Sequence, residues 1–440
     1  MNPSPPSLFA KLFLLLRSFG LATTTLSLLL LITFLGTLEQ VEHGLYESQV
    51  KYFESMFVTS IDVACCLRAM HIPYQGAFDL PIYILPGGYL LMVLLGVNML
   101  LGGIVRLKKE LVWLAKLPLR LVTGKFSELS PAPRAVGVLI AHMSIVFMLS
   151  AGLVSLYFKK DGAMSLGEGQ TSDEFQSFHD SVIEIERLNP PGKADQRTSL
   201  VIGGEFFEDL QGGKGRTFTH ADLPFELMVK NYEVNSVPRR AAGGQETNRE
   251  VIEGFFLQPI KEELEQEKNT DGAYVEAKLK DGSVQKGIIW RFAAAPFSIK
   301  IGDEIWGINL GRRTWKLPFA VRLDDFKREV HPGTERARRF TAEVTVTDQG
   351  SEQKKIITMN EPLRSRGYAL FQQSFDMQQD SGGQVRERST IQVVQNPSDH
   401  WPLISCITAG IGLLIHMVWQ LTRFLRKQEK TEPRTADATA

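Results

Sequence analysis

Two histidines stand inside long apolar stretches of this 440-residue chain, at His142 and His416. Ionisable side chains within a membrane span are rare, and they usually have a partner or a function. A neutral imidazole is a good axial ligand for haem iron, and the porphyrin around that iron is largely apolar. The two residues are therefore candidate haem ligands, with the iron as the metal. The alternative is that each ring only forms a hydrogen bond to a neighbouring helix.

The spacing of charged residues places the two histidines at a similar depth. His142 follows Arg134 by eight residues, and His416 precedes Arg423 by seven. At 1.5 Å per helical residue, each ring lies roughly 10–12 Å from that flank. On a helix His416 shares a face with Thr408 and Gly412, and these small residues are expected to leave room for a flat ring.

The remaining candidate groups carry weaker signals, and they are His43, His71, His400, Cys65 and Cys66. The three histidines are expected near the outer membrane edge, as solvated interface residues. The chain has three cysteines in all and no CxxC or CxxCH, which argues against a thioredoxin-like centre and against a c-type cytochrome. No nucleotide-binding, zinc-protease or serine-hydrolase motif occurs, so no catalytic residue is assigned. Basic and acidic residues both number 49, a balance that argues against nucleic acid as a partner.

Four stretches free of charged residues are long enough to cross a bilayer, which takes about 20 residues. They are residues 18–38, 80–105, 135–158 and 401–422. A signal peptide is the alternative for the first stretch, but no A-x-A site follows it. Pro81 and Pro86 predict an irregular turn at the start of the second stretch, and Gly96, Gly102 and Gly103 permit close helix packing there.

Charge asymmetry predicts the orientation, because Lys and Arg collect on the cytoplasmic side. Residues 106–134 hold seven basic residues against two acids, and the tail at 423–440 is also basic. Residues 39–79 hold six acids against two bases. Both termini, including the tail 1–17, are therefore expected in the cytoplasm, with residues 39–79 and 159–400 outside. The loop 106–134 mixes basic and apolar residues, so we expect it to lie along the inner surface, against lipid.

Residues 159–400 are long enough for a domain with its own core, and their patterns are typical of strands. In FTAEVTV, apolar residues alternate with polar ones before a DQG turn, and RSTIQVVQNP predicts a final strand. LPFELMVKNYEVNSVP from Leu223 and LPFAVRLDDFKREVHP from Leu317 form an internal repeat. The predicted fold class is thus four transmembrane helices with a large, mostly β extracytoplasmic domain inserted between the third and fourth, built from two similar units.

Several segments give the chain a recognisable pattern. They are GTLEQVEHGLYESQVKYFESMFV after the first span, LPGGYLLMVLLGVNMLLGGI, IAHMSIVFMLSAGLVS, LPFAVRLDDFKREVHPGT, and GYALFQQSFDM followed by VVQNP. With these segments the chain resembles the ResB (CcsB) family of System II cytochrome c biogenesis proteins. The resemblance extends to about Lys427.

The resemblance implies a subunit of the bacterial inner membrane that works with a multi-span ResC/CcsA-type partner. The pair would bring haem b across the membrane and attach it to the CxxCH of apocytochrome c. A third-span histidine, here His142, would help to ligate the haem. Fused family versions carry a Trp-rich segment, whereas Trp113, Trp290 and Trp401 are scattered here, so the chain is not expected to be the whole synthetase. Its role in catalysis would be at most a shared one.

Two other functions remain open on the sequence. The chain could be a structural chaperone that holds the partner or the apocytochrome, with histidines that only pack. It could also be a membrane b-type cytochrome in which His142 and His416 bridge one haem.

Overall fold

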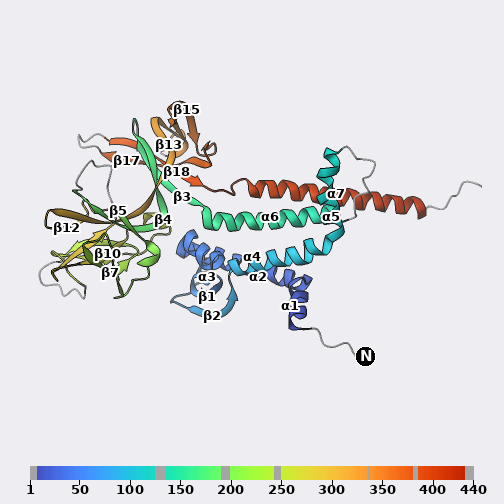
Figure 1. Ribbon diagram of the computed structural model, residues 1–440, viewed down its shortest axis with the longest axis horizontal. Coiled ribbons are helices and arrows are strands. Elements are labelled where there is room, and N and C mark those ends of the chain that lie inside the picture. The colour runs from blue at the N-terminus through green and yellow to red at the C-terminus, as the bar shows by residue number, and fades with distance from the viewer. Residues whose placement is uncertain are drawn as a thin grey trace, which may run out of the picture. The chain divides into compact units, whose positions relative to one another are not determined.

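The computed structural model describes residues 7–123, 135–189, 199–241, 249–334, 336–379 and 385–431. The chain divides into two compact units. The helical unit consists of Met1–Lys159 and Asn396–Ala440, and the β unit of Lys160–Gln395. Figure 1 shows long helices in the first and twisted sheets in the second. The helical unit contains α1 (Leu8–Leu16), α2 (Phe19–Gln49), the π-helix η1 (Val50–Glu54), β1 (Phe57–Asp62), α3 (Val63–Ala69), β2 (Asp79–Pro86), α4 (Gly88–Asn98), the π-helix η2 (Met99–Ile104), the 3₁₀-helix η3 (Val105–Leu107), α5 (Lys108–Val122), α6 (Val136–Phe158) and α7 (Trp401–Thr431).

Three of these helices are long and apolar enough to cross a membrane: Phe19–His43, Val136–Phe158 and Trp401–Gln428. They correspond to the predicted spans 18–38, 135–158 and 401–422, and two of them continue several residues further. The helix α2 is bent after His43, because Gly44 has φ 80°, outside the helical region. The chain is therefore a membrane protein with a large β-rich part.

The predicted span 80–105 differs most from the structure. Its first residues form β2, which pairs with β1, and the helix starts only at Gly88. An apolar run alone does not distinguish a strand from a buried helix. The helical stretch Gly88–Ile104 then turns by 83° into Lys108–Pro118, so the two together form one broken span or a re-entrant loop. Of the predicted surface loop 106–134, residues 124–134 lie outside the described residues.

Polar side chains fix the junctions between these helices. Asn98 is buried, and its side-chain amide donates to the carbonyls of Leu16 and Ser18, where α1 ends and α2 begins. A buried amide in an apolar helix is stable only when its hydrogen bonds are made. The helices α6 and α7 lie side by side, joined by a 2.8 Å hydrogen bond from Ser144 Oγ to Thr408 Oγ1 (Figure 1).

The β unit is built from antiparallel pairs. A ten-stranded sheet has the order β15-β14-β13-β4-β3-β18-β17-β16, with β12 on β13 and β5 on β4. A four-stranded sheet has the order β11-β10-β7-β6, and β8 pairs with β9. The strands are β3 (Lys160–Gly167), β4 (Thr171–Arg187), β5 (Ser199–Gly203), β6 (Gly215–Phe218), β7 (Phe225–Glu233), β8 (Ser236–Arg240), β9 (Phe255–Pro259), β10 (Gly272–Leu279), β11 (Val284–Trp290), β12 (Phe297–Ile301), β13 (Glu304–Val330), β14 (Ala337–Asp348), β15 (Ser351–Thr358), β16 (Leu363–Ser365), β17 (Tyr368–Gln379) and β18 (Val385–Gln395), with short 3₁₀-helices η5 (Gly204–Phe206) and η6 (Gln266–Lys268).

Two hydrophobic cores lie within the β unit, and each contains one copy of the sequence repeat. The first core includes Leu223, Phe225, Leu227, Val229 and Tyr232. The second includes the equivalent residues Leu317, Phe319, Val321, Leu323 and Phe326. The ladder shifts register in a similar part of both copies, between Lys230 and Glu233 in β7 and between Leu323 and Asp325 in β13. The prediction of two β-rich units therefore matches the two cores, but β4 and β13 run through both of them.

Candidate functional site

His142 lies in α6, about 9 Å along the axis from the start of the helix at Val136. Its Nδ1 is 2.8 Å from the carbonyl oxygen of Val138. Because a carbonyl can only accept, Nδ1 carries the proton and donates it. In the neutral ring Nε2 then keeps its lone pair, which is the tautomer that a metal-ligating imidazole needs. The half-buried ring is therefore oriented by its own helix.

The ring of His142 packs on Gly103, in the π-helix η2. A Cβ added to Gly103 would overlap the imidazole, with its three nearest neighbours all in the His142 ring. Single-turn π-helical segments often occur at functional sites. The sequence indicated close packing at Gly103, but only the structure identifies His142 as the group that approaches it.

His416 lies in α7 and contacts a different neighbour. A Cβ added to Gly137 would overlap the backbone and Cβ of His416, so the two helices touch here. His416 Nε2 is 3.1 Å from the side-chain amide nitrogen of Gln420, one turn further on. Since that amide donates, Nε2 accepts, and the buried Nδ1 has no hydrogen-bond partner among the described residues. The Nε2 of His416 is thus already hydrogen-bonded, whereas the Nε2 of His142 keeps its lone pair available for a metal.

The expected space for a ring beside Thr408 and Gly412 is filled by α6. Gly412 lies against Gly137 and Ala141, and Thr408 accepts a hydrogen bond from Ser144. That expectation was wrong, because small residues on a membrane helix also allow a second helix to approach closely. Among the described residues, the hydrogen bonds of the two histidine rings go to Val138 and Gln420, and neither ring bonds to the other.

His43, His71 and His400 lie in different surroundings. His43 Nε2 is 3.0 Å from Asp62 Oδ2, with a side chain that is 42% exposed. His71 is exposed and has φ 61°, just after α3. His400 is 70% exposed and lies 3.9 Å from Asp399. His71 and His400 fit the expected solvated role, whereas His43 belongs to a connected polar cluster.

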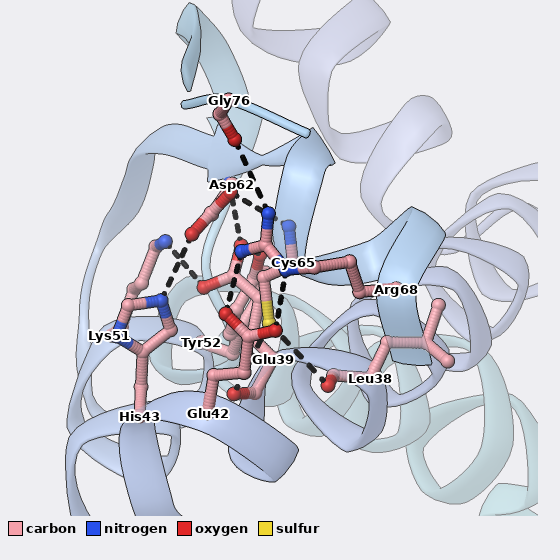
Figure 2. Close-up of polar contacts among 10 residues, drawn as sticks. All are labelled: Leu38, Glu39, Glu42, His43, Lys51, Tyr52, Asp62, Cys65, Arg68 and Gly76. Carbon is pink, nitrogen blue, oxygen red and sulfur yellow. Dashed lines mark hydrogen bonds and ion pairs between the residues drawn. The ribbon is translucent and has the colours of Figure 1, made fainter. Parts of the chain in front are cut away.

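This cluster is centred on Glu39, at the end of the first span, and Figure 2 shows its residues. Glu39 is only 1% exposed, yet its carboxylate accepts three hydrogen bonds. The donors are Lys51 Nζ at 2.5 Å, Tyr52 OH at 2.7 Å and the backbone N–H of Asp62 at 2.7 Å. A buried carboxylate needs such partners to offset its lost hydration. One signal was visible in the sequence, because Glu39 directly follows the charge-free residues 18–38.

A second ion pair connects the bent end of α2 to α3. Arg68 donates two hydrogen bonds of 2.6 Å to Glu42 and one of 3.2 Å to the carbonyl of Gly76. A bidentate guanidinium–carboxylate pair fixes both distance and orientation. The Glu39 and Arg68 contacts together tie residues 51–68 to α2. The sequence showed these charges only as a surplus of acids in residues 39–79.

Cys65 and Cys66 are buried beside these pairs. Burial, together with the nearby carboxylates, raises the pKa of the Cys65 thiol to about 11, so this cysteine is a thiol rather than a thiolate. Burial also raises the pKa of Asp62, but the N–H of Cys65 and the ring of His43 outweigh it and hold that pKa below its usual value. The two cysteines are free, which matches the expectation of ordinary thiols.

A model of the ResB-like family matches residues 301–385, from the end of β12 to the start of β18. The resemblance to the ResB family is confirmed. The matched stretch contains LPFAVRLDDFKREVHPGT and GYALFQQSFDM, both of which carried the resemblance in the sequence. The match supports a role in cytochrome c biogenesis. No curated protein matches the chain.

Proposed function

We propose that this chain is the ResB-type membrane subunit of a System II cytochrome c synthetase. It would help to move haem b across the bacterial inner membrane and attach it to CxxCH apocytochromes, together with a ResC/CcsA-type partner. The match over residues 301–385 supports the pathway. The observation that carries the haem role is the geometry of His142, whose Nε2 is left free by the bond from Nδ1 to Val138.

The residues of the chain itself prepare His142 for this role. The bond to Val138 fixes the ring plane, and contact with Gly103 limits its rotation. The surrounding helices are apolar, which suits the porphyrin face. Haem, as cargo, supplies an iron that accepts the Nε2 lone pair. His416 fits less well, because its Nε2 is engaged by Gln420, and we assign it at most a second contact.

The proposed direction of transfer follows from charge. The basic residues of α5, among them Lys108, Lys109 and Lys116, favour the cytoplasmic side. The β unit would then lie outside, where apocytochrome c is met. A reporter that is active only outside should work when fused after Gly350 and remain silent when fused after Val122. The reverse pattern would overturn the orientation.

The central experiment compares His142→Ala with the wild type, each co-expressed with the partner. Haem that copurifies, measured by its absorbance, and cytochrome c maturation should both fall while protein level is unchanged. External imidazole should partly restore both, because it can fill the vacated ligand position. His400→Ala is the matched control, since that side chain is 70% exposed and lies 3.9 Å from Asp399.

The result also decides between the three functions. Unchanged haem content in His142→Ala would return the histidine to packing and favour the structural chaperone. Haem that stays fully bound without the partner would favour a b-type cytochrome. Loss of haem together with dependence on the partner is the outcome that the proposal requires.

A further inference from the structure

Three side chains of types that can ligate a metal ion lie close together where the first span ends. His43 Nε2, Asp62 Oδ2 and Cys65 Sγ all lie within 4.8 Å of one another. Nitrogen and oxygen are 3.0 Å apart. Around one tetrahedral zinc ion, with bonds of about 2.0–2.3 Å, neighbouring donors are about 3.3–3.8 Å apart. The observed separations thus need only small side-chain movements to enclose an ion.

Three separate elements bring these donors together. His43 is the last residue before the bend of α2, where Gly44 has φ 80°, a value that favours glycine. Asp62 ends β1 and caps α3, and its Oδ1 accepts from the backbone N–H of Cys65 at 2.9 Å. That bond leaves Oδ2 facing His43, as Figure 2 shows. The sulfur of Cys65 lies 3.7 Å from the carbonyl of Glu39 and 3.8 Å from that of Leu38, so it is held on the α2 side.

We propose that His43, Asp62 and Cys65 form a binding site for a zinc-class divalent cation. Imidazole, carboxylate and thiolate together are a donor set typical of zinc. Water would supply the fourth ligand from the side of His43, whose side chain is 42% exposed. The ion would join the end of α2 to the start of α3. This site is distinct from the haem role of His142, and neither depends on the other.

The surrounding charges favour a cation. Around the three donors, the carboxylates outnumber the basic groups even while Cys65 is a neutral thiol. The carboxylates are Glu39, Glu42 and Asp62, and the basic groups are Lys51 and Arg68. On binding, the S–H bond of Cys65 breaks, its proton goes to solvent, and the electron pair forms the metal–sulfur bond. The His43 ring moves its proton from Nε2 to Nδ1, so that Nε2 supplies the second bond. No oxidant or reductant is needed.

The test uses the full-length, reduced protein in detergent, with Cys406→Ser as background, because Cys406 is an exposed thiol. Cobalt(II) is added after chelation and dialysis, and its absorbance is recorded. Tetrahedral cobalt bound to sulfur gives a near-ultraviolet charge-transfer band and visible d–d bands. We expect these to saturate at one cobalt per chain, to be bleached by zinc, and to release one proton.

Matched variants locate the ligands. Cys65→Ser should abolish the charge-transfer band, whereas Cys66→Ser, the adjacent buried thiol, should keep it. Asp62→Asn preserves the helix cap. It should nevertheless lower the affinity for cobalt by at least the roughly 10–100-fold that is typical when a residue bonded to a metal ligand is replaced. The proposal is overturned if the wild type gives no sulfur–cobalt band, if Cys65→Ser retains it, or if Asp62→Asn and His43→Gln bind cobalt as tightly as the wild type.

Discussion

Replacing Phe319 by Asp should unfold the second core of the β unit. Phe319 is 3% exposed, and its ring lies 6.1 Å from that of Tyr368 in an edge-to-face contact. Truncating a buried Phe costs about 3–5 kcal/mol. Burying a carboxylate with no partner adds at least about 2 kcal/mol. The sum, about 5–7 kcal/mol, is comparable to the whole stability of many domains, about 5–15 kcal/mol.

Pulse proteolysis of the full-length protein across a urea series measures this effect. Cleavage sites mapped by mass spectrometry should appear in β14, β15 and β17 at urea concentrations where the wild type is intact. Phe292→Asp is the control, because the same change falls on a side chain that is 64% exposed and should shift stability by no more than about 0.5 kcal/mol. If the two variants resist protease equally, Phe319 is not a core residue and the assignment of the repeat is refuted.

Three further predictions concern other parts of the chain. Gly103→Ala should lower copurified haem, because its Cβ would overlap the His142 ring. Gly152→Ala, which has open space around it, should not lower it, and equal haem in both variants would show that Gly103 does not position the histidine. Glu39→Gln should lower the free energy of unfolding, measured by urea titration, by about 2–3 kcal/mol, somewhat less than for a fully buried pair because Lys51 is 30% exposed. Glu54→Gln, at a residue that accepts a hydrogen bond from Gln49, should lower it far less, and equal losses would contradict the burial of Glu39. Hydrogen bonds from Lys230 and Lys286 hold the pKa of Glu276 below its usual value. Ionised Glu276 therefore contributes to folding stability above about pH 5, and this contribution is lost as the pH falls through the folded pKa. The wild type should lose more stability on acidification than Glu276→Gln, and parallel pH profiles would refute this coupling.

The sequence already contained the positions of three spans and the strand content of the β unit. A bilayer requires a long run without charge, and alternation with period two marks a half-buried strand, so both signals are local. The turn predicted after FTAEVTV is present, with Gln349 at φ 48° and Gly350 at φ 81° between β14 and β15. The repeat at Leu223 and Leu317 correctly indicated two cores, because equivalent apolar positions point inward in both copies.

Other features depend on residues that are distant in the chain, and only the tertiary structure decided them. Residues 80–86 begin a charge-free run that could equally start a helix, but pairing with β1 makes them a strand. The small residues Thr408 and Gly412 equally permit a cofactor or a helix beside them, and α6 occupies that space.

The polar site at the end of α2 was hidden for the same reason. Glu39 and Asp62 are 23 residues apart, and His43 and Asp62 are 19 apart, and no local pattern links them. The bend at Gly44 and the cap of α3 bring them together. Residue types show which chemistry a side chain can perform. Whether Glu39 is paired, or His142 keeps a free nitrogen, depends on which atoms the folded chain places within hydrogen-bonding distance.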